Sequence, residues 1–238
     1  MSISLRPAST RGTFDHGWLK TAHTFSFGDY NDPEHMGFGP LRVINDDVVA
    51  PGQGFGMHPH RDMEILTYII SGTLAHQDSL GNTEQIKAGQ LQRMTAGRGI
   101  RHSEFNASRA EPVHLLQIWV IPSQRGLEPS YEDLDLGAPA AGNGSPLRLV
   151  AAPGGGDGVL TINQDAKMYL ARFDACEGAR LSLAPGRSAY IQAFKGAVRV
   201  GEQRLGPGDG AAITGESSVA LAGEADSAAV VFDLPPWE

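Results

Sequence analysis

The sequence predicts an all-β protein made of two antiparallel barrel domains, and three observations support this prediction. Glycine and proline are frequent, with 30 and 15 of the 238 residues, which favours many short strands joined by turns over a helical bundle. Strand-like segments recur every 8–12 residues or so, with turn residues between them. The second half of the chain also repeats a pattern of the first. The length suits one large β unit or two compact domains.

The N-terminal half shows its strands most clearly in its central part. Residues 63–70 are rich in β-branched and aromatic side chains and end at a Ser-Gly turn, as expected for a strand. Residues 113–121 are almost continuously apolar, which is typical of a strand buried on both faces. Further strands are expected, in order along the chain, at 73–78, 83–86 and 91–94.

The C-terminal half follows a stretch of small, turn-forming residues at 137–146 and a glycine-rich loop at 152–158. Strands are expected again at 168–173, 179–183, 189–194 and 197–200. The segment that begins at Tyr68 and passes through Gly72 has a counterpart that begins at Tyr190 and passes through Gly196. We therefore predict a duplicated barrel with an N-terminal domain at 1–135, a linker and loop at 136–158 and a C-terminal domain at 159–238.

The composition limits the partners and the compartment. Nineteen basic residues against 27 acidic ones give a net charge of -8, which argues against direct contact with nucleic acid. The sequence has no apolar run of 18 residues and no secretory leader pattern, so we expect no membrane span. A lone cysteine, Cys176, fits a reducing compartment. We expect a cytoplasmic monomer.

Two short motifs point to a metal site. All eight histidines lie within the first 114 residues, and His58 and His60 are spaced so that a strand places both on one face. His102 and Glu104 have the same spacing later in the chain. Three imidazoles and one carboxylate form a mixed N/O site that suits Fe(II), Mn(II), Ni(II), Cu(II) or Zn(II), but not Ca(II) or Mg(II).

The C-terminal half offers no comparable set. Where we expect the repeat to place the paired histidines, the sequence has Tyr190 and Gln192, and no histidine follows. Neutral Tyr and Gln side chains do not replace imidazoles for a divalent ion, so we expect a metal-free second barrel that acts as a structural partner or lid. Cys176 has no histidine nearby in sequence to activate it, so we expect no catalytic thiol.

The metal motifs carry a resemblance to the cupins. Gly52, His58, His60 and Glu64 are spaced as in the first cupin motif, and the second motif is matched by Gly89, Thr95, Gly97, His102 and Asn106. Two departures, a longer spacing before His102 and threonine in place of proline at Thr95, are those of the pirin branch. The chain resembles pirins, above all bacterial pirin-like quercetin 2,3-dioxygenases, in the strings HTFSFG at 23–28, GPLRVINDD at 39–47, HPHRDME at 58–64 and MTAGRGIRHSE at 94–104.

The resemblance implies a bicupin of two jelly-roll barrels, with one metal ion in the N-terminal barrel. The implied ligands are His58, His60, His102 and Glu104, and Fe(II) is the favoured ion, with Mn, Ni, Cu and Zn as alternatives. Glu64 would then be a buried neighbour of the ligands or a base that faces the substrate. By strand parity Glu64 shares a face with His58 and His60, which leaves it open as a ligand, although we favour Glu104.

The implied activity is the ring opening of a flavonol such as quercetin by O₂, with release of carbon monoxide. The metal would lower the pKa of the flavonol hydroxyl, and Glu104 or Glu64 would accept its proton. Phe55, Met57 and Leu66 are expected to form an apolar wall against the flat substrate. The adjacent Asp46 and Asp47 are expected in turns or at the surface.

A second hypothesis is that the protein is a non-enzymatic regulator. Some pirins act by binding other proteins, as transcriptional cofactors or as modulators of metabolic enzymes, with the metal as a structural or redox-sensing element. The acidic composition is compatible with such a protein partner. A third hypothesis is a small-molecule isomerase or a storage cupin, because the cupin fold hosts many functions.

Overall fold

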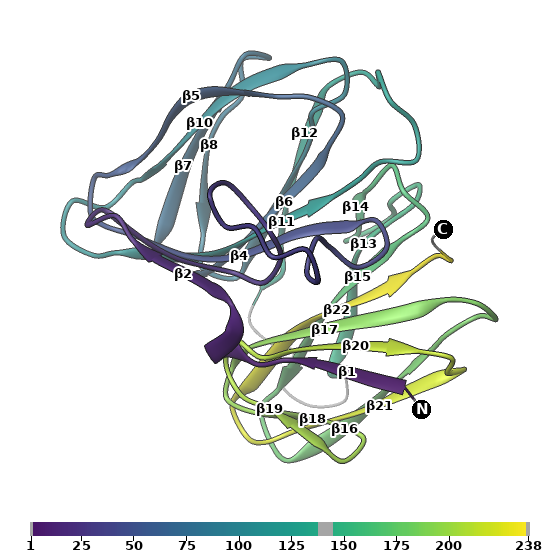
Figure 1. Ribbon diagram of the computed structural model, residues 1–238. Coiled ribbons are helices and arrows are strands. Elements are labelled where there is room, and N and C mark those ends of the chain that lie inside the picture. The colour runs from purple at the N-terminus through teal and green to yellow at the C-terminus, as the bar shows by residue number, and fades with distance from the viewer. Residues whose placement is uncertain (1, 138–144, 237–238) are drawn as a thin grey trace.

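The fold is all-β, as predicted, and consists of two domains stacked on one another (Figure 1). The computed structural model describes residues 2–137 and 145–236. The predicted linker at 136–158 lies partly outside these residues, and within its described part Leu147–Ala152 form strand β13. Val150 is fully buried in this strand, so the predicted linker contains part of the core of the C-terminal domain. Among the described residues, no helix is long and apolar enough to span a membrane.

The N-terminal domain contains one seven-stranded and one four-stranded sheet. The larger sheet has the order β12 (Ser130–Asp135), β9 (Gln90–Thr95), β6 (Glu64–Ser71), β11 (Val113–Val120), β4 (Leu41–Val49), β3 (Leu19–His23) and β2 (Gly12–Asp15). The smaller sheet has the order β5 (Gly54–His60), β10 (Ile100–Asn106), β7 (Thr73–Asp78) and β8 (Thr83–Lys87).

The C-terminal domain repeats this arrangement. Its larger sheet has the order β1 (Ser2–Arg6), β20 (Gly210–Thr214), β17 (Ser188–Lys195), β22 (Ser227–Leu234), β15 (Lys167–Phe173), β13 and β14 (Leu160–Thr161). Its smaller sheet has the order β16 (Glu177–Ser182), β21 (Ser218–Gly223), β18 (Val198–Val200) and β19 (Gln203–Leu205). Across the described chain the four sheets remain separate, so each domain is a two-sheet jelly-roll sandwich, which confirms the predicted bicupin fold of two antiparallel jelly-roll domains.

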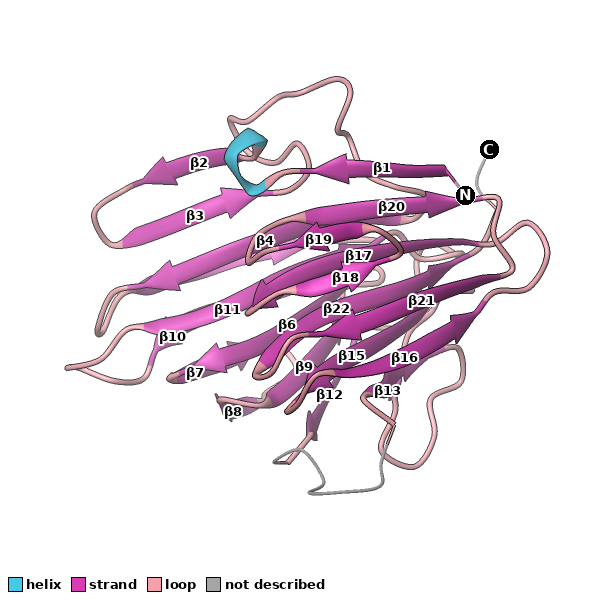
Figure 2. Cartoon of the chain, turned by 90° about the horizontal axis from the view of Figure 1, so that it is seen from below, coloured by secondary structure: helices cyan, strands magenta, loops and turns pink. Residues whose placement is uncertain are grey.

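The first strand crosses from one domain to the other. β1 pairs antiparallel with β20 over five residue pairs, from Ser2 opposite Thr214 to Arg6 opposite Gly210. Figure 2 shows β1 beside β20, with the 3-10 turn Ala8–Thr10 leading on to β2. Residues 2–6, which the sequence assigned to the N-terminal domain, therefore form the edge strand of the C-terminal sheet.

Strand order also corrects one detail of the predicted repeat. β5 and β16 occupy the same edge position in the two smaller sheets, and β6 and β17 occupy the same position in the larger ones. Tyr190 and Gln192 lie on β17 and so correspond to β6, not to the strand that carries His58 and His60. The sequence repeat placed the counterpart of His58 and His60 on β17 because the apolar pattern that β6 and β17 share is the strongest part of the repeat.

The main core lies between the two seven-stranded sheets, which face each other in the middle of the molecule (Figure 1). Buried side chains from both domains meet there, among them Leu66, Leu116, Met168 and Phe232. The smaller sheets cover the outer faces, giving a four-layer molecule. Burial of this much apolar surface between the domains fixes them against each other.

The interiors of the two sandwiches differ in chemistry. The C-terminal interior is an apolar cluster that includes Phe173, Leu181, Val219 and Leu221. The N-terminal interior has apolar clusters at its two ends, one around Leu115 and the other around Ile65, with buried polar side chains between them. Burying polar groups costs free energy of folding. We therefore expect the functional site in this middle band of the N-terminal sandwich.

Candidate metal centre

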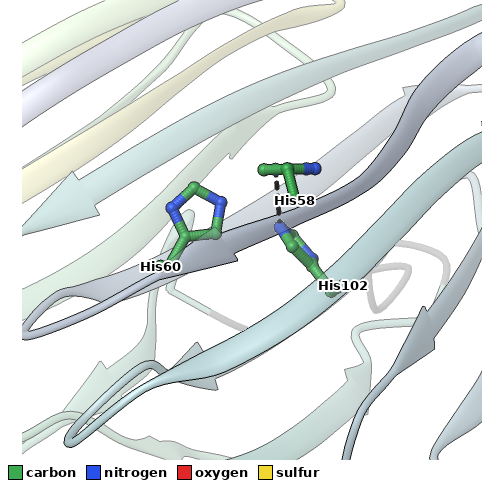
Figure 3. A group of neighbouring side chains, drawn as sticks. All are labelled: His58, His60 and His102. Atoms are coloured by element: carbon green, nitrogen blue, oxygen red, sulfur yellow. Dashed lines mark hydrogen bonds between the residues drawn. The ribbon is translucent and has the colours of Figure 1, made fainter.

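Three histidines converge inside the N-terminal sandwich from two adjacent strands (Figure 3). β5 carries His58 and His60, and β10 carries His102 directly opposite His58. Two residues later the partner of β10 shifts, because Glu104 pairs with Phe55 and β5 therefore contains one extra residue, a β-bulge. The three histidines lie in the regular part of the pairing, so the bulge changes the register only around Glu104.

The imidazole rings are arranged around a common centre. Their centroids lie 4.5 Å apart for His58 and His102, 4.7 Å for His58 and His60, and 4.8 Å for His60 and His102. The Nε2 atoms of His58 and His102 are 3.1 Å apart. His58 Nδ1 lies 2.7 Å from the carbonyl oxygen of Gly56; donation of its proton to that oxygen leaves the Nε2 lone pair free.

Burial keeps two of these histidines neutral. Desolvation, reinforced by the neighbouring imidazoles, lowers the pKa of His60 to about 4 and that of His102 to about 3. A neutral imidazole presents the lone pair that a metal ion needs, whereas a protonated one does not. The cluster is therefore prepared for a cation at neutral pH.

Glu104 lies near His102, with ligand atoms within 4.8 Å of each other, but the described residues do not bring it within that distance of both His58 and His60. Side chains of the opposite sheet hold its carboxylate. Its Oε1 accepts hydrogen bonds from Gln92 Nε2 at 2.7 Å and from Thr67 Oγ1 at 3.4 Å, and its Oε2 accepts one from Gln117 Nε2 at 2.9 Å. Thr67 stands opposite both Gln92 and Gln117 in the larger sheet, so the three donors form one row across it. Neutral donors stabilise a buried carboxylate and fix its direction.

The same row continues beyond Gln117 to Asn45 and His23. His23 Nδ1 lies 2.7 Å from Asn45 Oδ1, and burial lowers the pKa of His23. This row was hard to predict from the sequence, because its members are single polar residues on five different strands. A signal was present in β6 and β11, where Thr67 and Gln117 interrupt otherwise apolar runs.

The structure places Glu64 away from the histidine cluster. Its carboxylate accepts hydrogen bonds from Thr95 Oγ1 at 3.0 Å and from Asn163 Nδ2 at 3.2 Å, and burial raises its pKa. Asn163 belongs to the C-terminal half, so Glu64 links the two domains. The parity expectation was wrong because β5 ends at His60, the chain turns at Asp62 with a φ of 50°, and β6 begins in the other sheet.

A cavity of about 230 Å³ opens beside the histidines. His58, His60 and Glu104 line it together with the aromatic side chains of Phe27, Phe55 and Trp119 and the polar ends of the row described above. Of the expected wall residues, Phe55 lines the cavity, but Met57 is 46% exposed and Leu66 lies in the core between the domains. Glu64 is not among the described residues that line it.

Two aspartates expected in turns or at the surface lie in strand β4. Asp46 forms ion pairs with Arg11 and His114. Asp47 faces the sandwich interior, is 3% exposed and lines the cavity. The expectation was wrong because an Asp-Asp pair is typical of turns, whereas here the strand continues through it and alternation sends the two carboxylates to opposite faces.

His76 also lies close to the cluster. Its ring stacks on Tyr131 with centroids 4.8 Å apart, and its Nε2 is 3.3 Å from Asp78 Oδ2. His76, His102 and Glu104 offer ligand atoms within 4.8 Å of one another. His76, which pairs with Glu104 across β7 and β10, is therefore a further nitrogen donor next to His102 and Glu104.

The residues present fit a transition-metal ion. His58 Nε2 and His102 Nε2 are 3.1 Å apart, close enough for both nitrogens to bind one ion at about 2.1 Å. Neutral imidazoles with one carboxylate suit a first-row divalent ion. Apolar side chains occupy the topologically equivalent interior positions in the C-terminal domain, where Leu181 pairs with Val219 and Leu221 lies two residues further along β21.

The fold and the site together define a bicupin with a candidate metal centre in its N-terminal domain. Residues 4–120 match the Pirin family model, and residues 149–234 match the model of the quercetinase C-terminal cupin domain. The chain belongs to the pirin family.

Relatives along the whole chain support this assignment. The chain is 47% identical over 234 residues to a protein of Escherichia coli K12 named quercetin 2,3-dioxygenase, covering 98% of this chain and 99% of that one. It is 40% identical over 233 residues to a pirin-like protein of Caulobacter vibrioides, covering 97% and 99%. The crystal structure of the bacterial pirin YhhW from Escherichia coli in complex with nickel(II) superposes with a TM-score of 0.93 at 46% identity, covering 99% of this chain and all of that one.

Proposed function

We propose that this protein is a metal-dependent dioxygenase that opens the central ring of a flavonol such as quercetin, consuming O₂ and releasing carbon monoxide. The observation that carries the proposal is an aromatic-walled cavity lined by His58, His60 and the buried Glu104, with His102 grouped beside the two histidines. The name of the Escherichia coli relative, quercetin 2,3-dioxygenase, supports the substrate class.

We assign His58, His60, His102 and Glu104 as the ligands of one divalent ion. When bound, the ion supplies a Lewis acid that favours the ionised flavonol hydroxyl, with open positions beside the four ligands. Fe(II) is the ion that we propose as native; the nickel(II) complex of YhhW shows that a related pirin binds another first-row metal.

The protein's own side chains bind and orient the substrate. Phe27, Phe55 and Trp119 offer ring surfaces to a flat ligand and keep water away from it. The cavity, at about 230 Å³, is smaller than the roughly 300–1,000 Å³ of typical ligand pockets. Glu104 lines the cavity and is the carboxylate that we propose as acceptor of the hydroxyl proton, whereas Glu64 is engaged at the domain boundary.

Metal loading followed by turnover tests the proposal. Protein purified without oxygen and loaded with Fe, Mn, Ni or Cu should consume quercetin in air, seen as loss of flavonol absorbance and as released carbon monoxide. His102→Ala should lose both the metal and the activity. Absence of turnover with every metal would refute the dioxygenase and favour the regulatory reading with a protein partner.

A matched pair of variants tests the two glutamates. Glu104→Gln should lower kcat by about 10²–10⁴-fold if this carboxylate handles the proton. Glu64→Gln, an equally conservative change at a buried carboxylate, should leave both metal content and kcat within a few-fold of the wild-type values. The reverse result would transfer the proton-accepting role to Glu64.

A further inference from the structure

A buried carboxylate that the proposed mechanism does not use forms part of the cavity wall. Asp47 is 3% exposed, and its Oδ1 atom has no hydrogen-bond partner within residues 2–137 and 145–236. An unsatisfied buried polar group destabilises the folded protein, and more strongly when it is charged. A carboxyl group that only supported the fold would be expected to have its partners within the protein.

The register of the strands locates Asp47 within the cavity. Asp47 lies two residues beyond Asn45 on β4, which places it on the same face, about 7 Å further along the strand. Thr21 pairs with Asp47, and Leu19 pairs with the next inward residue, Val49. Asp47 therefore lies between the polar row that holds Glu104 and the apolar end of the cavity at Leu19 and Phe55.

No basic group neutralises Asp47 among the described residues around it. The groups that act on it are the Thr21 hydroxyl, the carboxylates of Asp46 and Glu104, and His114. Both His114 and Arg11 are paired with Asp46 on the other face of the strand. Asp47 thus keeps one carboxyl oxygen, Oδ1, without a hydrogen-bond partner among the described residues, in a cavity with aromatic walls, and its chemistry suits a phenolic hydroxyl.

We propose that Asp47 is a specificity-determining residue whose carboxyl group binds a hydroxyl of the aromatic substrate remote from the oxygen that faces His58 and His60. The inference rests on the proposed function and narrows its substrate class to flavonols with at least one ring hydroxyl besides the 3-hydroxyl. A ligand without that hydroxyl leaves the carboxyl group unpaired, which is how polar sites discriminate strongly.

Calorimetric binding without oxygen tests the inference separately from turnover. The nickel-loaded protein is titrated with quercetin and with 3-hydroxyflavone, which lacks the other hydroxyls. The wild type should bind quercetin at least tenfold more tightly. At pH 8, above the pKa of about 7 to which burial raises Asp47, Asp47→Ala should weaken quercetin binding about 10–100-fold, as expected for a hydrogen bond to a charged group, and should leave 3-hydroxyflavone binding and metal content unchanged.

Two further variants complete the design. Asp46→Ala removes the neighbouring carboxylate on the opposite face of β4 and should keep the preference for quercetin. Asp47→Asn preserves the shape of the side chain and removes its charge, so it tests the role of Asp47 if Asp47→Ala does not fold. The preference of this variant for quercetin over 3-hydroxyflavone should be at least threefold smaller than that of the wild type.

The outcomes separate the two proposals. An unchanged preference in a folded Asp47 variant overturns the role of Asp47 and leaves the dioxygenase standing. A preference that depends on Asp47, in a protein that turns over no flavonol with any metal, supports Asp47 and overturns the dioxygenase. A wild type that binds neither flavonol overturns both.

Discussion

Replacing Asp47 by asparagine should stabilise the metal-free protein, and increasingly so as the pH rises. Burial is the main cause that raises the pKa of Asp47 from 3.8 to about 7. The unfolded chain loses this proton near pH 4 and the folded protein retains it until about pH 7, so wild-type stability decreases over that interval. An asparagine side chain has the same shape and no proton to lose.

The size of the effect follows from the pKa difference. Each unit corresponds to about 1.36 kcal/mol, so the ionisable side chain costs about 1.5 kcal/mol at pH 5 and about 4 kcal/mol at pH 8. The advantage of Asp47→Asn should therefore grow by roughly 2–3 kcal/mol between these pH values. Urea unfolding in the presence of a chelator, followed by circular dichroism at pH 5, 6, 7 and 8, measures this difference directly.

The comparison with Asp46→Asn provides the control. Asp46 is ion-paired and its pKa is lowered, with the hydrogen bond from His114 as the largest of the causes that lower it, so its replacement should destabilise the protein. A difference between Asp47→Asn and the wild type that stays constant from pH 5 to pH 8 would refute the claim that Asp47 is desolvated and without a charge partner.

Three further predictions concern the support of the site and the packing. Gln117→Leu removes a donor to Glu104 and should weaken metal binding about 10–100-fold with the fold intact, measured by metal titration against a chelator; an unchanged affinity would contradict a supporting role. Phe232→Ala opens a cavity in the core between the domains and should cost about 3–5 kcal/mol of unfolding free energy, measured in urea. Gly223→Ala places a methyl group against the ring of Phe173 and should cost about 1–3 kcal/mol; a fully stable variant would show that the ring has room to move.

Local sequence patterns, namely strand-like segments between turn residues and paired alternate residues, predicted the fold class and the three histidines of the cluster. Alternation along strands applies within one strand, and His58 with His60, or His102 with Glu104, lie on single strands. The same rule failed for Glu64, because a turn at Asp62 lies between it and His60. The rule that alternate residues share a face no longer applies once the chain passes from one sheet to another. The sequence contains no clear signal for that change of sheet.

Contacts between distant segments were beyond prediction from one sequence. The donors of Glu104 come from three strands, and each polar residue among them has many possible explanations when read alone. Asp47 was assigned to a turn on the character of its dipeptide, although its burial is decided by the strands on either side of β4. Which strand lies beside which is set by the packing of the whole domain.

The exchange of the first strand affects the order in which the molecule can be completed during synthesis. β1 leaves the ribosome first, but its hydrogen-bonding partner β20 is made roughly two hundred residues later, which at about 5–20 residues per second is a delay of roughly 10–40 s. The N-terminal sandwich, including its histidine cluster, can form during that interval without β1. Ser2–Arg6 can pair with β20 only after that interval, so the C-terminal sheet joins a strand from the start of the described chain to one from near its end.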